Sequence, residues 1–280
     1  MVLKWSLAAA AAAVVAGCFP AFGGQGPTGD WNVDARTGVV ALSDVHAGDI
    51  LTSFTFKNVG KKTVTAFVVS WTTIHSADPI TRHIDFFRTP SGGLAPGGTY
   101  QMNFDPSDAA SVRNHTFQIS AAIFADESSE GSQSDVAFVD FRRLGCMTET
   151  ARVAVILARA DLERADDAVR VLAGKIGTLP RSRQEAFASL ELVSLPGVDT
   201  PRLKAALVEP GAFAAFLDGL RNEREDAQRG VDRLKGAPLE STNPRVPNRE
   251  AVLVTLRQKY EQKDAKYRAY CARVPGGLHQ

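Results

Sequence analysis

Cysteine is scarce in this chain, and the short motifs of familiar catalytic sites are absent. Only three of the 280 residues are cysteine, so at most one intramolecular disulfide can form. The sequence has no Gly-x-Ser-x-Gly elbow, no phosphate-cradling glycine loop, no Cys-x-x-Cys redox pair and no His-Glu-x-x-His zinc motif. From the sequence we therefore assign no catalytic, cofactor-binding or metal-binding residue, and we expect no cofactor.

Long apolar runs and a large excess of one charge are also missing. The apolar run at residues 7–16 is ten residues long, about half of the roughly 20 that a membrane-spanning helix needs. Residues 19–145 carry nine Lys and Arg against thirteen Asp and Glu, and residues 146–280 carry 22 against 18. Neither half is basic enough to indicate nucleic-acid binding.

Residues 1–24 have the pattern of a secretory signal peptide. Lys4 precedes the short apolar run, and small residues follow it. Residues 25–29 are rich in glycine and suit a flexible tether. We therefore expect the chain to be exported from the cytoplasm.

The end of the apolar run is Val15-Ala16-Gly17-Cys18. This segment resembles the lipobox of bacterial lipoproteins, in which an aliphatic residue and two small residues precede a lipidated cysteine. The resemblance implies lipidation of Cys18 and a lipid anchor in a membrane of the bacterial envelope. The alternative is ordinary cleavage near Ala21-Phe22-Gly23, which would release a periplasmic or secreted protein.

Residues 30–145 have the pattern of short β-strands. Hydrophobic residues recur at a period of two, which places one set of side chains on a core face. Residues 63–71 form a longer β-branched run that we expect to be buried on both faces, with Trp71 in the core. Turn signals rich in Gly and Pro separate the strands. The alternating segments are residues 54–57, 100–104, 117–123 and 137–141.

Three segments of this half carry a family resemblance. They are Phe54-Thr55-Phe56-Lys57-Asn58-Val59-Gly60, Ala66-Phe67-Val68-Val69 and Leu94-Ala95-Pro96-Gly97-Gly98-Thr99-Tyr100. With their Asn-x-Gly and Pro-Gly turns, they resemble bacterial immunoglobulin-like domains of the CARDB and related adhesion-type families. The resemblance covers about 40% of the chain. It implies an Ig-like antiparallel β-sandwich of seven or eight strands and no particular ligand.

Beyond Cys146 the hydrophobic residues recur at spacings of three and four, which indicates helices. Prolines mark the breaks between them. A capping box at residues 182–185 predicts a short helix, and Thr200-Pro201 predicts a cap followed by a first-turn proline. We therefore predict an antiparallel α-helical bundle over residues 146–275, with its first long helix near residues 147–177. The three long seams are residues 155–176, 213–234 and 253–270.

This layout predicts a disulfide. Cys146 would begin the first long helix and Cys271 would lie near the end of the last, so antiparallel packing brings both cysteines to one end of the bundle. An exported chain that retains two cysteines usually pairs them. We predict a Cys146–Cys271 bridge; the alternative is two buried free thiols.

Three further groups of residues are candidates for sites. His46, His75, His83 and His115 lack a recognised ligand spacing, and we expect them to be scattered. The acidic loop at residues 126–135 has the oxygen ligands that calcium prefers, although a polar hairpin needs no ion. Tyr260, Tyr267 and Tyr270 share one helical stripe, which suits either an interaction surface or packing between helices.

From these patterns we predict a non-enzymatic module of the bacterial cell envelope, anchored to the membrane through Cys18. It would bind another envelope protein or a peptide, or serve a structural role. One alternative is a soluble periplasmic protein that captures a small molecule or peptide where the sandwich meets the bundle. An exported enzyme is a further alternative.

Overall fold

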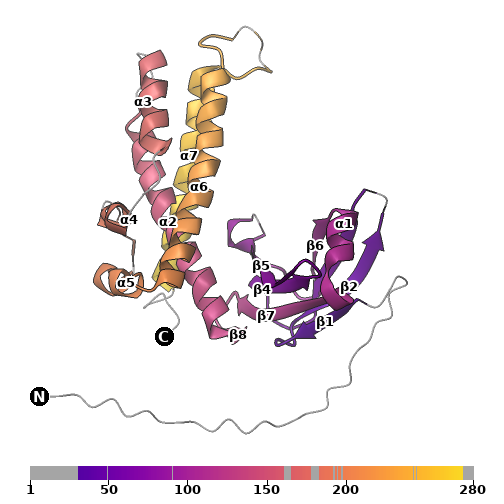
Figure 1. Ribbon diagram of the computed structural model, residues 1–280. Coiled ribbons are helices and arrows are strands. Elements are labelled where there is room, and N and C mark those ends of the chain that lie inside the picture. The colour runs from indigo at the N-terminus through magenta and orange to yellow at the C-terminus, as the bar shows by residue number, and fades with distance from the viewer. Residues whose placement is uncertain are drawn as a thin grey trace, which may run out of the picture.

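The structure is a computed structural model, and apart from the short helix α1 (Pro106–Ser111) between two strands, its strands precede its α-helices along the chain (Figure 1). It describes residues 31–273 apart from residues 49, 90, 161–164, 178–182, 192, 194, 197, 242 and 244. The predicted signal peptide, tether and lipidated Cys18 lie outside the described residues.

Within the described part of the N-terminal half, eight strands form two sheets. They are β1 (Asn32–Ala35), β2 (Val40–Ala47), β3 (Thr52–Asn58), β4 (Val64–Thr73), β5 (Ser76–Asp85), β6 (Thr99–Phe104), β7 (Thr116–Phe124) and β8 (Ser129–Gly131). One sheet has the order β1-β7-β4-β5, with β8 also paired to β7, and the other has the order β2-β3-β6. Strand β1 runs parallel to β7, whereas we predicted antiparallel strands throughout.

An aromatic core fills the space between the two sheets. The ring centroid of Phe117 lies 4.9 Å from that of Phe54 and 5.9 Å from that of Trp71. Both contacts are edge to face, the geometry that the quadrupoles of aromatic rings favour. Trp71 is thus a core residue, as predicted. The buried aromatic residues that share this core are Phe54, Phe56, Phe67, Trp71, Phe86, Phe104, Phe117 and Phe124.

The larger sheet is buried on its second face as well. Ala66 and Val68 of β4 and Ile123 of β7 pack there against Val136 and Val139 of helix α2 (Gln133–Ala158). Nearly every residue of β4 is therefore buried, which confirms the prediction made from its β-branched run.

Helix α2 begins thirteen residues earlier than the predicted boundary at Cys146. The predicted strand at residues 137–141 was wrong, because those residues lie in this helix. Its start is marked by Ser132, whose side chain accepts a hydrogen bond from the Asp135 amide at 3.4 Å. Its buried face has the spacing of a helix. The buried residues nearest its start are Val136, Val139, Asp140, Arg143 and Leu144.

Five more helices follow α2. They are α3 (Ala165–Gly177), α4 (Arg183–Glu191), α5 (Thr200–Ala206), α6 (Pro210–Gly236) and α7 (Arg249–Arg273). The single long helix predicted near residues 147–177 is instead the end of α2 and a separate α3. The first turn of α5 is capped by Asp199, which accepts a hydrogen bond from the Arg202 amide at 3.1 Å, so the predicted cap Thr200 lies one position inside the helix.

The long helices pack side by side. Helices α2 and α6 run in the same direction, since Cys146 contacts Gly219 and, one turn later, Glu149 contacts Arg224. Helix α7 runs opposite to both: Cys271 contacts Met147, and Arg257 donates a hydrogen bond to the Leu157 carbonyl at 2.9 Å.

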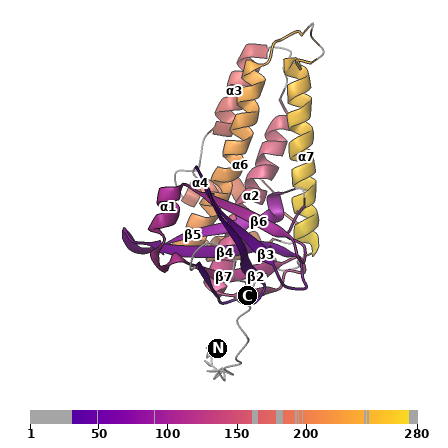
Figure 2. The same cartoon turned by 90° about the vertical axis from the view of Figure 1, so that its right-hand side faces the viewer.

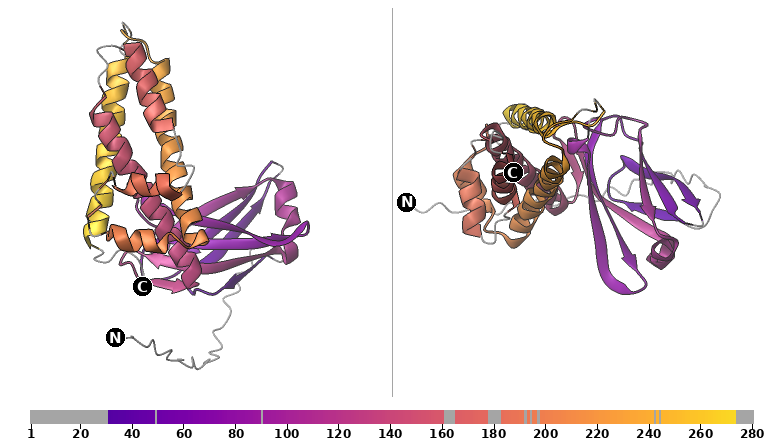
Figure 3. Two further views of the ribbon diagram at one scale, coloured as in Figure 1. Left: turned by 60° about the vertical axis from the view of Figure 1, so that its left-hand side comes forward. Right: turned by 90° about the horizontal axis from the view of Figure 1, so that it is seen from above.

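We call the end of the helical half that packs on the larger sheet the base, and the opposite end the tip. Figures 2 and 3 show the helices rising from the base beside the sheets, with the α6–α7 connection at the tip. Among the described helices, none combines the length and the apolar character needed to cross a membrane.

Candidate functional site

Cys146 and Cys271 are free, buried thiols, which differs from the predicted disulfide. The Cys146 sulfur lies 3.5 Å from the Gly219 carbonyl oxygen, and the Cys271 sulfur lies 3.4 Å from the Met147 sulfur. Consecutive helical residues point about 100° apart, so Cys146 faces α6 while Met147 faces α7. Burial raises the pKa of the Cys146 thiol to about 12, so the thiol is unreactive.

The other candidate sites from the sequence do not assemble either. Within the described part of the chain, no three His, Cys, Asp or Glu side chains come together as a metal site. In the acidic loop, Asp126 pairs with Lys62 at 2.7 Å, and the hydrogen bond from Lys62 lowers the pKa of Asp126 to about 2. Glu127 accepts a hydrogen bond from Tyr270 at 2.6 Å. These carboxylates are engaged by protein groups, which leaves the calcium alternative without support.

The junction between sheets and helices is filled by a buried ion pair. The Arg143 side chain on α2, 2% exposed, contacts Asp85 at the end of β5 at 2.9 Å and the Thr65 hydroxyl at 3.1 Å. Phe87, in the 3₁₀ helix Phe86–Arg88, covers the guanidinium from 5.2 Å. The place that the sequence analysis offered as an alternative ligand site is thus occupied by the protein itself.

Above the junction, three carboxylates lie in the core of the helical half. Glu149 of α2, fully buried, accepts hydrogen bonds from Arg224 at 2.9 and 3.0 Å and from Arg152 at 2.6 and 2.8 Å. Each Arg–carboxylate contact uses two hydrogen bonds, the stronger geometry for such a pair. These contacts tie α2 to α6 through their polar groups.

The second and third carboxylates, Glu223 and Asp226, lie on α6 beside Arg224 and further toward the tip, and we call the three carboxylates with their cationic partners the charge network. Glu223 contacts Arg88 at 2.7 Å and Lys263 at 2.8 Å. Asp226 contacts both Lys263 and Lys259 at 2.8 Å. Burial alone would raise the pKa of Asp226, but the hydrogen bonds from the two lysines outweigh it and lower that pKa. Asp226 is therefore an anion shared by two cations.

Tyr260 and Tyr267 pack within this network. The Tyr260 hydroxyl donates to the Glu223 carbonyl oxygen at 3.2 Å, and the Tyr267 hydroxyl lies 3.3 Å from the Glu223 carboxylate. Both side chains are buried. Of the two readings of the tyrosine stripe, packing between helices is confirmed for these two residues.

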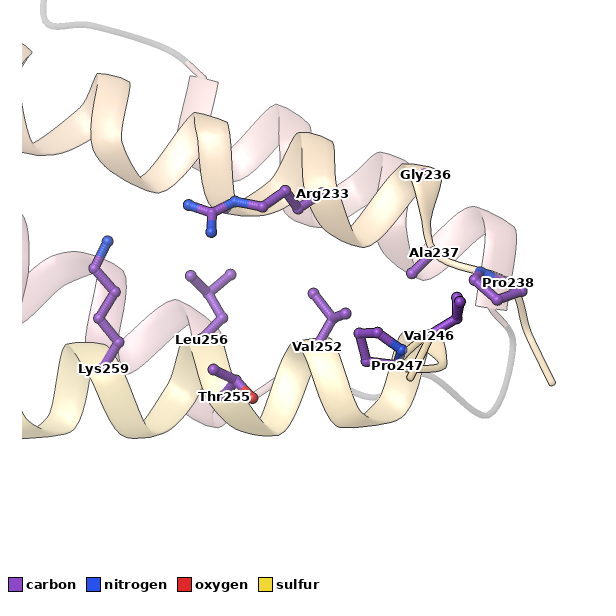
Figure 4. A pocket seen from close by; sticks show the side chains of 11 residues that line it. Arg233, Gly236, Ala237, Pro238, Val246, Pro247, Val252, Thr255, Leu256 and Lys259 are labelled. Atoms are coloured by element: carbon purple, nitrogen blue, oxygen red, sulfur yellow. The ribbon is translucent and has the colours of Figure 1, made fainter. Parts of the chain in front are cut away.

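The network ends at an apolar cleft between the tip ends of α6 and α7. The cleft has a volume of about 440 Å³, within the roughly 300–1,000 Å³ of small-molecule sites. Both helices and the segment that connects them contribute side chains (Figure 4). The lining residues are Gly230, Arg233, Gly236, Ala237, Pro238, Val246, Pro247, Val252, Thr255, Leu256 and Lys259.

Polarity changes along the cleft. Figure 4 shows Lys259 and Arg233 on opposite walls toward one end, while Val246, Pro247 and Pro238 close the other. On α7, Val252, Leu256 and Lys259 share one face over a rise of about 10 Å. The cleft is therefore elongated along the helices, with cationic groups at one end and apolar side chains at the other.

Sequence reasoning did not find this cleft. Val252 and Thr255 are not among the hydrophobic positions that define the seam at residues 253–270, and Pro238 and Pro247 indicate only helix breaks. The combination that carries a signal is a proline-rich connection between two seams, flanked by Arg233 and Lys259. Helix spacing alone does not show that two neighbouring helices leave a space between them.

Comparisons with models of known protein families, with curated proteins and with solved structures found no match.

Proposed function

We propose that this chain is a non-enzymatic ligand-binding protein of the bacterial cell envelope, with the tip cleft as its binding site. The observation that carries the proposal is the cleft itself, which combines apolar walls with two cationic side chains. Such a combination is typical of sites that hold a small molecule and fix its orientation. The ion pairs of Glu149 and Glu223 hold the supporting helices together, and rigid elements favour a preformed site.

The proposed location rests on the sequence. The signal-peptide pattern of residues 1–24 and the lipobox-like segment ending at Cys18 support export and a lipid anchor in the envelope membrane. In this proposal the strands form an Ig-like β-sandwich and the helices a bundle. The two facing sheets and the side-by-side helices support that reading.

The cleft favours the small-molecule alternative over a purely structural module. It puts the binding site at the tip instead of at the junction between strands and helices. A ligand at the junction was one alternative from the sequence, but Arg143 and Asp85 fill the space there. The tip lies at the far end of the helices from the sheets (Figure 1). A ligand at the tip would be held away from the strands.

The test is a titration with Nile red, a neutral dye whose fluorescence rises in apolar surroundings. Val252 lines the cleft, whereas Val254 on the same helix is 42% exposed and does not. We expect saturable binding to the wild type and to Val254→Trp, and loss of binding in Val252→Trp, whose indole would fill the cleft. Equal binding by both variants, or no saturable binding by the wild type, would contradict the proposal.

A further inference from the structure

The distribution of charge at the tip identifies a ligand class for the cleft. Arg233 donates a single long hydrogen bond, 3.4 Å, to the Arg229 carbonyl. Among the residues that the structure describes, it has no acidic partner. Its guanidinium therefore presents donors at the cleft in the fork geometry that matches a carboxylate.

The opposite wall carries a second cation that is incompletely neutralised. Lys259 pairs with Asp226, but Asp226 also pairs with Lys263 at 2.8 Å and contacts Arg229 at 3.6 Å. Asp226 thus contacts three cationic side chains, one of which, Lys263, also pairs with Glu223 at 2.8 Å. The cationic end of the cleft has an excess of positive charge, which an anionic ligand group would balance.

Other cationic side chains lie close to these carboxylates. Among the residues that the structure describes, those that contact Glu149, Glu223 or Asp226 include Arg88, Arg152, Arg224, Arg229, Lys259 and Lys263. Among these cations, Lys259 lines the cleft, where a ligand can reach it.

The remainder of the cleft is apolar. Leu256, Val252 and Pro247 follow one another away from the charged end (Figure 4). Val246, which helps to close the apolar end, is 43% exposed. Covering a valine side chain is energetically favourable. A ligand that covers these residues must itself be apolar over this length.

We infer that the cleft binds a single-chain amphiphilic carboxylate of the fatty-acid class. Its carboxylate would lie between Arg233 and Lys259, and its hydrocarbon chain would run along Leu256 and Val252 toward Pro247. This inference rests on the proposed function, because it names the ligand of the same site.

The experiment is displacement of Nile red from the full chain by dodecanoate, with dodecanol and dodecyltrimethylammonium as neutral and cationic chains of the same length. We expect dodecanoate to compete at least about tenfold better than either. We also expect Arg233→Gln to remove that preference, when the competition by each chain is expressed relative to the variant's own affinity for Nile red. Lys235→Gln is the matched control, since Lys235 pairs with Asp232 at 3.4 Å and does not line the cleft.

The outcomes separate the two proposals. Failure of Nile red to bind contradicts the proposed function itself. Saturable Nile red binding with equal competition by dodecanol and dodecanoate, or an unchanged preference in Arg233→Gln, overturns the ligand class alone. Tighter competition by lysophosphatidylglycerol than by dodecanoate overturns the fatty acid in favour of a lipid headgroup.

Discussion

The base and the tip of the helical half use the same helix α6 in opposite ways. At the base, α6 touches α2 through its backbone: a Cβ on Gly145 would lie 2.1 Å from the Phe216 carbonyl oxygen, and one on Gly219 would lie 2.0 Å from the Arg142 carbonyl oxygen. At the tip, α6 is separated from α7 by a cleft of about 440 Å³. Helix α6 thus packs closely on α2 at the base and leaves a cleft beside α7 at the tip.

The largest expected effect comes from removing Glu149, whose ion pairs hold α2 and α6 together. Glu149→Ala leaves Arg224, 4% exposed, and Arg152 without their shared carboxylate. We expect the free energy of unfolding to fall by about 3–5 kcal/mol, because a buried charge becomes unpaired. Urea unfolding measures the change. The control is Glu225→Ala on the exposed side of α6, which should change stability by less than about 0.5 kcal/mol; similar losses in both variants would refute the role of the network.

The next effect comes from the same substitution, glycine to alanine, at a closely packed position of the base and at an open position of α3. Gly219→Ala places a methyl group against the backbone of α2 and should cost about 1–3 kcal/mol or more. Gly174→Ala in α3, where nothing lies within 4 Å of the added methyl group, should stabilise by about 0.5–1 kcal/mol, since alanine favours helices over glycine. Thermal unfolding compares them. A stabilising effect of Gly219→Ala would contradict the close backbone contact between α2 and α6.

A smaller effect is expected from acid. The pKa of Asp226 is lowered in the folded protein, so its contribution is fully present above the unfolded pKa of about 3.9 and is lost as the pH falls below it. Asp226→Asn should lower stability at pH 7 by on the order of 1 kcal/mol, reduced by the partial exposure of the pair. The difference from the wild type should shrink between pH 5 and pH 3, as followed by Tm. A difference independent of pH would show that the charge of Asp226 does not matter, and Asp232→Asn in an exposed pair serves as the control.

The smallest expected effect is none at all. Because Cys146 and Cys271 are free thiols, reduction should leave the intact mass of the chain unchanged, and the native protein should resist thiol reagents that label it once unfolded. Mass spectrometry with and without reductant gives the answer. A gain of two hydrogens on reduction would restore the disulfide predicted from the sequence.

The sequence predicted most of the strands and helices whose hydrophobic pattern lies within one short segment. The period-two segments at residues 54–57, 100–104 and 117–123 lie in β3, β6 and β7, and the seam at residues 213–234 lies in α6. Residues 137–141 alternate too, yet they lie in helix α2. Ser132 caps this helix, and Val136, Val139 and Arg143 have helical spacing, so only a helix buries all three on one face. The N-cap at Ser132 was the sequence signal for this helix that the strand prediction overlooked.

The candidate site could not be predicted from the pattern of any single segment. Arg233 and Lys259 are 26 positions apart, and both occur on amphipathic helices where a charged residue is ordinarily a solvated one. What distinguishes them is the sharing of Asp226 between Lys259 and Lys263 and the cleft between α6 and α7. Both depend on tertiary packing, which no periodicity encodes.

The burial of the larger sheet by α2 also makes the N-terminal half depend on residues that follow it in the chain. A chain truncated after residue 131 would contain all the described strands but would lack Val136 and Val139, which pack on Ala66, Val68 and Ile123. The truncated chain would carry an exposed apolar sheet face, and such a face promotes aggregation.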